Sequence, residues 1–128
     1  MDLVEYATKM NRVANKIHGS MLKAVQDYAQ TLEDEIVARQ GTPPAPNIHT
    51  TDYQGSWSHK ATQAGETVEA VVGTNKPQGR RLEFGFIGPD RKGRVYHQAP
   101  RPHVAPAIEA TTSEWEKTWR GVIVDALK

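Results

Sequence analysis

The sequence predicts an α+β fold in which a small antiparallel β-sheet packs against a long N-terminal helix and a C-terminal helix. Apolar residues recur every three or four positions over residues 3–37 and again over residues 104–127, which is typical of amphipathic helices. Between them, hydrophobicity alternates and β-branched residues are frequent, which is typical of strands. A chain of 128 residues has the size of one domain, so we expect a single domain over residues 1–128.

The N-terminal helix is expected to be longer than a compact protein of this size is wide. Asp2 can cap its first turn, and Gln40-Gly41 with the prolines that follow ends it. About 36 helical residues span roughly 54 Å, whereas a compact globule of this mass is about 30 Å across. We therefore expect a kink or a break at Gly19-Ser20, or a helix that projects to meet another subunit.

Shorter elements follow before the last helix. Residues 41–50 form a proline-rich connector that suits neither helix nor strand. The elements expected after it are an antiparallel hairpin, a short helix, a short strand and the C-terminal helix: Ser56–Gln63 paired with Thr67–Gly73, then Gln78–Phe84, Val95–His97, and the segment from Pro102 onward. Pro102 and Pro106 fall in or near the first turn of that last helix, where proline is tolerated, and Thr111-Thr112 is a place where it can break and restart.

The composition excludes several classes of protein. There is no cysteine, which excludes disulfides, thiolate zinc sites and cysteine nucleophiles. No apolar run is long enough to span a membrane, and the acidic start of the chain is unlike a secretory signal, so we expect no membrane contact. A formal net charge of +1 does not indicate a protein that coats nucleic acid over its whole surface.

This near-neutral total conceals a segregation of charge. Residues 76–103 carry seven basic and two acidic side chains, a net charge of +5, so the other 100 residues sum to −4. The same segment holds four of the ten glycines and four of the eight prolines, which predicts an irregular basic loop at about residues 85–102. A long loop in a small domain is more often functional than not, because few contacts of its own offset the entropy of ordering it. The alternative is a solvated loop without a partner.

The sequence offers no recognisable catalytic motif. Phosphate-binding loops, dinucleotide-binding glycine motifs, nucleophile elbows and the HExxH zinc motif are all missing. Glu33, Asp34 and Glu35 are consecutive, so they point around a helix instead of forming an acid–base pair. His97 and His103 are expected to be exposed loop imidazoles, because their spacing does not suit a metal site. We therefore expect no enzyme, no metal and no cofactor.

Glu83 admits two interpretations. It stands beside Arg80 and Arg81, and we expect it to pair with one of these arginines. The alternative is a buried general base, since Phe84 follows it directly.

The aromatic residues near the basic segment also admit two interpretations. Trp57, Phe84, Phe86 and Tyr96 could form a stacking platform of the kind that single-strand-binding proteins use. We favour a core position for Trp57 and Phe84. Phe86 is different, because its glycine-rich surroundings make it hard to bury within one subunit, so it is expected to anchor a partner.

Three short motifs of the chain resemble those of one known protein family. Thr51–Trp57 (TDYQGSW) looks like the entry to that family's first strand, T-G-x-L-x-x-S. Leu82–Gly85 (LEFG) looks like its x-E-F-G-T signature, with Phe86 in place of the threonine. Arg101–Ala107 (RPHVAPA) is similar to R-P-F-L-R-P-A at the start of the C-terminal helix, with His103 for the aromatic residue and Ala105 for the basic one. The family that these motifs resemble is the tail-completion or head–tail joining (neck) proteins of long-tailed bacteriophages.

The resemblance covers nearly the whole chain in layout and some 20 residues in motif. It implies a structural virion protein that forms a homo-oligomeric ring, typically a hexamer, at the head–tail junction. Such a ring would join the connector or head-closure proteins to the tail-tube or tail-terminator proteins and leave a passage for DNA. The protein would then assemble in the host cytoplasm and remain in the neck of the virion. Alternatives are a tail terminator that caps the tail tube and a small nucleic-acid-binding module.

Two groups of residues are expected to serve this role. The subunit interface or the DNA passage is assigned to charged residues and one aromatic residue: Arg80, Arg81, Glu83, Phe86, Arg91, Lys92, Arg94 and Arg101. The conformation at the two ends of the basic loop is assigned to Phe84, Gly85, Pro102 and Pro106. Gly85 would provide a positive φ, and Phe84 would pack in the core.

Overall fold

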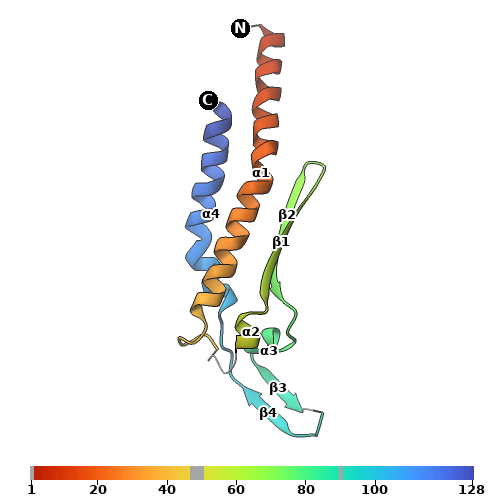
Figure 1. Ribbon diagram of the computed structural model, residues 1–128, viewed down its shortest axis with the longest axis vertical. Helices are drawn as coiled ribbons and strands as arrows, with labels where there is room; N and C mark the ends of the chain where they lie inside the picture. Colours follow the sequence, from red (N-terminus) through yellow and green to blue (C-terminus); the bar gives the residue numbers. More distant parts are fainter. Residues whose placement is uncertain (1, 47–50, 90) are drawn as a thin grey trace.

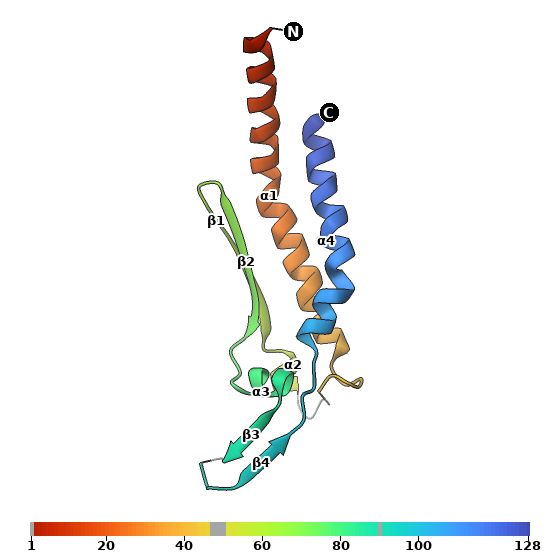
Figure 2. The same ribbon diagram turned by 180° about the vertical axis from the view of Figure 1, so that it is seen from behind.

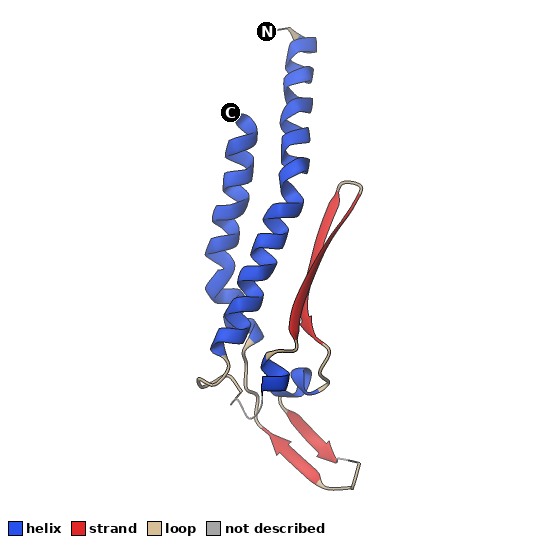
Figure 3. Ribbon diagram, viewed as in Figure 1, coloured by secondary structure: helices blue, strands red, loops and turns tan. Residues whose placement is uncertain are grey.

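The computed structural model describes residues 2–46, 51–89 and 91–128. Within these ranges it contains two long helices, two short helices and two β-hairpins (Figures 1 and 3). In chain order the elements are α1 (Leu3–Arg39), α2 (Thr51–Gln54), β1 (Trp57–Ala64), β2 (Thr67–Thr74), α3 (Gln78–Phe84), β3 (Phe86–Pro89), β4 (Val95–Gln98) and α4 (Val104–Leu127). This arrangement confirms the α+β class.

Helix α1 is continuous over 37 residues. Asp2 and Glu5 form a capping box at its start, in which each side chain accepts a hydrogen bond from the backbone of the other. The helix does not break at Gly19-Ser20, but it bends near its middle, and its N-terminal part extends beyond the end of α4 (Figure 2). The helix is therefore bent and not broken, and its N-terminal part projects from the protein.

Helix α1 lies between the β1–β2 hairpin and α4 (Figure 1). Strands β1 and β2 pair antiparallel from Trp57 opposite Thr74 to Ala64 opposite Thr67. On its other side α1 packs against α4, where the Tyr28 hydroxyl lies 3.0 Å from Oγ1 of the buried Thr111. This Oγ1 also donates to the carbonyl of Ala107 within α4. The helix therefore runs through Thr111-Thr112 without the break that the sequence suggests.

The hydrophobic core is small and lies near the C-terminal end of α1. Its buried members are Ile36, Trp57 and Ala107, and half-buried apolar side chains surround them: Leu32, Val37, Tyr53, Val72 and Val104. The core position expected for Trp57 is confirmed, with 9% of the residue exposed. This core joins α1, α2, β1, β2 and the start of α4 at one end of the molecule.

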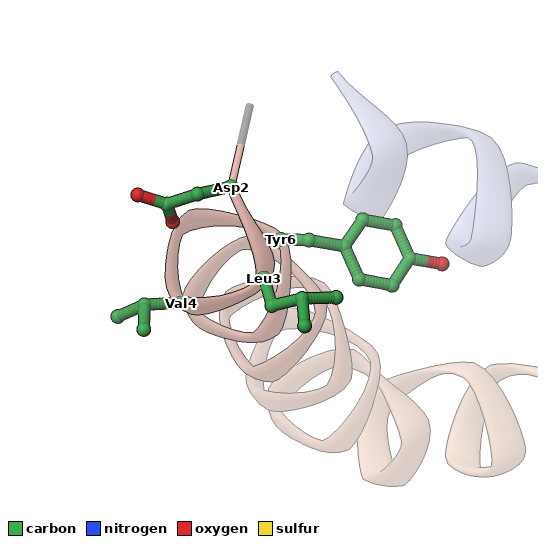
Figure 4. Close-up of a pocket in the computed structure, with 4 residues that line it drawn as sticks. All are labelled: Asp2, Leu3, Val4 and Tyr6. Atoms are coloured by element: carbon green, nitrogen blue, oxygen red, sulfur yellow. The ribbon is translucent and has the colours of Figure 1, made fainter.

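The protein exposes more surface than a compact protein of its mass. Its accessible surface is 9082 Å², whereas a compact monomer of 14.2 kDa exposes about 6,800 Å². Part of the difference lies at the free end of α1, where Leu3 is 86% exposed and Val4 is 74% exposed. Leu3 and Tyr6 point to one side of the helix and Val4 points to the other (Figure 4), so the three side chains do not form one apolar stripe. In the described residues, no helix is long and apolar enough to cross a membrane.

Candidate interface at the β3–β4 arm

A second hairpin occupies the segment expected to be an irregular loop. Strands β3 and β4 pair antiparallel, with Phe86 opposite Gln98 and Pro89 opposite Val95. We refer to residues 86–98 as the arm. The expectation of a fully irregular loop at about 85–102 is therefore wrong, although the expected strand Val95–His97 is confirmed. The sequence does not predict β3, because Gly88 and Pro89 are both unfavourable in strands. Pro89 is tolerated because it is the last residue of the strand, where the missing N–H costs little.

The arm extends away from the rest of the protein (Figures 1 and 3). Because side chains alternate along a strand, one face of the arm carries Ile87, Pro89, Val95 and His97. Ile87 is 75% exposed and Val95 is 64% exposed. An isolated two-stranded hairpin is marginally stable in water, and an exposed apolar face makes it a candidate interaction surface.

The other face of the arm is covered from within the same chain. The guanidinium carbon of Arg81 lies 3.9 Å from the centre of the Phe86 ring, a cation–π contact. A Cβ atom at Gly88 would lie 3.0 Å from Phe86 Cζ, so the ring rests against the Gly88 backbone. Phe86 is thus half-buried in its own hairpin, although its glycine-rich surroundings led us to expect that it would be hard to bury within one subunit.

Phe84, in contrast, is more exposed than the sequence predicts. The sequence places it in the core, but it is 74% exposed at the end of α3. The reason is the short, seven-residue α3, which turns Leu82 and Glu83 toward the protein and leaves the next side chain outside. Among the side chains described in this region, the large apolar ones that are mostly exposed are Phe84, Ile87 and Val95.

Glu83 joins α3 to the start of α4. Its Oε2 accepts hydrogen bonds from the backbone N–H groups of His103 and Val104, at 2.8 and 3.0 Å, and its Oε1 accepts one from Ala105 at 3.0 Å. The next residue, Pro106, has no N–H to satisfy. Glu83 therefore caps α4, whose N-cap residue makes no side-chain capping bond of its own.

This arrangement corrects two interpretations of Glu83. The side chain is only 9% exposed, and its two oxygens are bound by backbone donors of the same chain. Because the Glu83 carboxylate binds the start of α4, it does not form the expected ion pair with Arg80 or Arg81. For the same reason, Glu83 is not one of the residues that could face a neighbouring subunit. A carboxylate that accepts three backbone hydrogen bonds is also a poor general base, because those bonds stabilise its charged form.

Gly85 lies where the chain turns from α3 into the arm. Its φ of 82° and ψ of 171° are a conformation open essentially to glycine alone, which confirms the positive φ expected there. A Cβ atom would lie 2.8 Å from the Gln98 carbonyl oxygen and 3.0 Å from Pro100 Cδ. The Arg101 N–H donates to the Leu82 carbonyl at 2.6 Å, so the two ends of the arm are tied together at its base.

His103 is the centre of the buried cluster behind Glu83. It is fully buried, contrary to the expectation of an exposed loop imidazole, and its ring packs edge-on against Tyr53 and Trp57. The Arg101 carbonyl accepts from Nδ1 at 2.9 Å, so Nδ1 carries a proton, and the Tyr53 hydroxyl donates to Nε2 at 2.6 Å. Sequence reasoning missed this cluster, although His103 occupies the aromatic position of the motif it resembles.

The remaining residues assigned from the sequence lie at the surface. Arg91, Lys92 and Arg94 are exposed at the tip of the arm, between β3 and β4. Arg80 and Arg81 are exposed on α3, and Arg101 is exposed in the segment before α4. Pro102 and Pro106 are half-buried on either side of the α4 start, which is two residues later than Pro102. The basic residues are thus divided between the tip and the base of the arm.

The motif Thr51–Trp57 leads into the first strand, as the resemblance implies. Thr51–Gln54 forms the short helix α2, and the strand begins at Trp57. Residues 47–50 of the expected connector, and Asp90 in the basic segment, lie outside the described residues.

The cluster at the base of the arm predicts a dependence of stability on pH. Burial and the nearby Glu83 charge raise the pKa of Tyr53 from 10.0 to about 12. Burial alone would raise the pKa of Glu83, but the backbone hydrogen bonds from Ala105, His103 and Val104 outweigh it and leave that pKa below 4.5. The contribution of Tyr53 to the free energy of unfolding is therefore complete below pH 10 and is lost toward pH 12. The contribution of Glu83 to the same free energy is complete above pH 4.5 and is lost in more acidic solution.

We expect the free energy of unfolding in urea to fall above pH 10, and to fall less steeply in Tyr53→Phe, which has no phenol to ionise. Tyr6→Phe, at an exposed position of α1, is the matched control and should leave the alkaline slope unchanged. Equal alkaline slopes in the wild type and Tyr53→Phe would contradict the role given to Tyr53.

No protein-family model, curated protein or solved structure matches the chain. The functional interpretation therefore rests on the motifs and on the geometry of the arm.

Proposed function

We propose that this protein is a structural subunit of a homo-oligomeric ring, of hexameric type, in the neck of a long-tailed bacteriophage. The ring would join the connector or head-closure proteins to the tail-tube or tail-terminator proteins, around a passage for DNA. The observation that carries the proposal is the arm: a hairpin with a bare apolar face and a basic tip, which extends from a body of near-neutral charge. Such an extension would let a ring subunit reach its neighbour.

The anchoring of the arm supports the family resemblance. The motifs Leu82–Gly85 and Arg101–Ala107 lie far apart in sequence, yet Glu83 of the first caps the helix that the second begins. Arg101 and Leu82 add the backbone hydrogen bond between them. Residues that the resemblance selects thus form one structural unit, which holds the base of the arm. No base-specific contact is required in this role, because a passage for DNA needs only local positive charge.

A small nucleic-acid-binding module is the second candidate, because three basic residues gather at the arm tip. The aromatic platform expected for it loses two of its four members, because Trp57 is in the core and Phe86 is covered by Arg81. A module of this kind would bind DNA as an isolated protein, with an affinity that falls steeply as salt rises. A ring subunit on its own would largely lack this affinity.

The test of the proposed function is particle assembly in a phage that carries this gene. We expect Arg91→Ala/Lys92→Ala/Arg94→Ala to give filled heads and complete tails that are not joined. The matched control removes the same charge from exposed positions elsewhere, Lys9→Ala/Arg12→Ala/Lys117→Ala, and should give normal particles. The proposal fails if both triple variants support normal infectivity, or if labelling finds the protein outside the neck. Pull-down with connector or tail-tube proteins separates a joining ring from a tail terminator.

A further inference from the structure

We infer that the apolar face of the arm in one copy of the protein docks on an exposed apolar stripe of helix α4 in a second copy. This inference rests on the proposed function and identifies the two surfaces that meet between adjacent ring subunits. It starts from Ile87 and Val95, which are mostly exposed on a hairpin too small to be stable alone.

The exposed area indicates a second copy as the partner. The accessible surface exceeds that of a compact monomer of this mass by roughly 2,300 Å². Permanent homo-oligomers bury areas of this order, about 2,000 Å² or more in total. Copies of the same chain can therefore cover the excess.

The receiving surface is a stripe along one flank of α4, made of Ile108, Trp115, Trp119 and Ile123. The intervals of seven, four and four residues place these side chains on one side of the helix. Ile108 is 44% and Ile123 is 37% exposed, and both tryptophans are partly exposed. The rings of Trp115 and Trp119 stack 6.0 Å apart, and Trp115 also contacts Tyr28 of α1, which holds the stripe rigid. The α4 stripe is thus a preformed aromatic surface.

Length and charge fit the arm to this stripe. Four residues of β3 span about 13 Å, so the arm can lie along more than half of the roughly 22 Å that the stripe rises from Ile108 to Ile123. Exposed Glu109 and Glu116 border the stripe, and the arm tip carries Arg91, Lys92 and Arg94. Opposite charges at the border of an apolar contact set its orientation more than its affinity.

The contact has to form between copies. The arm points away from the body at the end opposite to the free ends of α1 and α4, in both views of the molecule (Figures 1 and 2). Its apolar face therefore lies beyond the stripe of its own α4. An arm that binds a different surface on the next copy makes a head-to-tail contact, which closes into a ring when the rotation between subunits allows.

The absence of natural cysteine provides a clean test by cross-linking. Protein with only Ile87→Cys is mixed with protein with only Ile108→Cys and oxidised mildly with copper–phenanthroline. We expect a disulfide-linked dimer that contains one chain of each kind. Val71→Cys replaces Ile108→Cys in the matched control, because Val71 is 62% exposed on β2 and lies outside the stripe; this mixture should give at least about tenfold less dimer.

Charge reversal tests the orientation. Arg91→Glu/Arg94→Glu should reduce the cross-link about tenfold, and adding Glu109→Arg/Glu116→Arg to the partner should restore it. The inference is overturned if the Val71→Cys mixture cross-links equally well, if only identical chains become linked, or if no disulfide-linked dimer forms. It is also overturned if the charge-reversed arm loses DNA binding while the yield of the cross-link is unchanged. Sedimentation separates the two proposals: oligomers without the 87–108 link refute only the docking, whereas a chain that is monomeric in solution and absent from the neck refutes the ring.

Discussion

Replacing Glu83 by alanine is expected to lower the free energy of unfolding by about 3 kcal/mol. The variant leaves the N–H groups of His103, Val104 and Ala105 without their acceptor, at the start of a 24-residue helix. Hydrogen bonds to a charged acceptor are worth about 1.5–3 kcal/mol each, and water entering the space of the lost side chain recovers part of the total. A domain of this size has only about 5–15 kcal/mol to lose, so we expect a clear shift of the urea midpoint.

Two further variants isolate the cause. Glu83→Gln keeps one acceptor oxygen and the shape of the side chain, so we expect roughly half of the loss. Glu109→Gln removes a carboxylate from an exposed position of α4 and should change stability by less than about 0.5 kcal/mol. Equal urea midpoints for Glu83→Ala and Glu109→Gln would show that Glu83 does not stabilise the start of α4.

The helices and the first hairpin could be predicted because local patterns determine them. The apolar stripes of α1 and α4 have the helical period, and α3 begins at Gln78 and ends at Phe84 as expected. Strands β1 and β2 differ from the expected ranges by one residue. The short helix α2 was missed, because four residues are too few to show a period.

The arm could be predicted only in part, because its order comes from pairing between segments. Strand β3 reads as a loop with Gly88 and Pro89, and it becomes a strand only where β4 supplies the backbone partners. For a similar reason, the sequence predicts a buried Phe84 and an exposed Phe86, whereas Phe84 is exposed and Phe86 is half-buried. The orientation of α3 exposes Phe84, and the contacts that cover Phe86 come from Arg81 and Gly88.

The buried cluster depends on contacts between residues that lie still further apart in the sequence. Glu83 stands next to two arginines in the sequence, and nothing local indicates that its carboxylate binds a helix that begins 21 residues later. Tyr53 and His103 are 50 residues apart, and their hydrogen bond forms only after α2 and the start of α4 meet at the core. The motif resemblance thus selected positions 83–85 and 101–106, whereas the contacts that these residues make could be identified only from the fold.

Replacing Gly85 by alanine is expected to cost about 3 kcal/mol and to release the arm from its fixed position. The backbone conformation accounts for about 1–3 kcal/mol, because residues with a Cβ rarely adopt φ 82° with ψ 171°. The rest comes from the new Cβ, which would lie 2.8 Å from the Gln98 carbonyl oxygen and 3.0 Å from Pro100 Cδ, so the backbone has to move.

Gly93→Ala is the matched control, because Gly93 also has a positive φ, 80°, but has open space where a Cβ would be. We expect it to cost only about 1–2 kcal/mol, from backbone strain. Hydrogen exchange should show faster exchange in β3 and β4 for Gly85→Ala, with α1 and β1 unchanged. If Gly85→Ala and Gly93→Ala destabilise equally and leave the arm equally protected, then close packing at residues 98–100 does not hold the arm. The geometry of Gly85 would in that case be a property of the turn alone, and the rigid presentation of Ile87 and Val95 would need another cause.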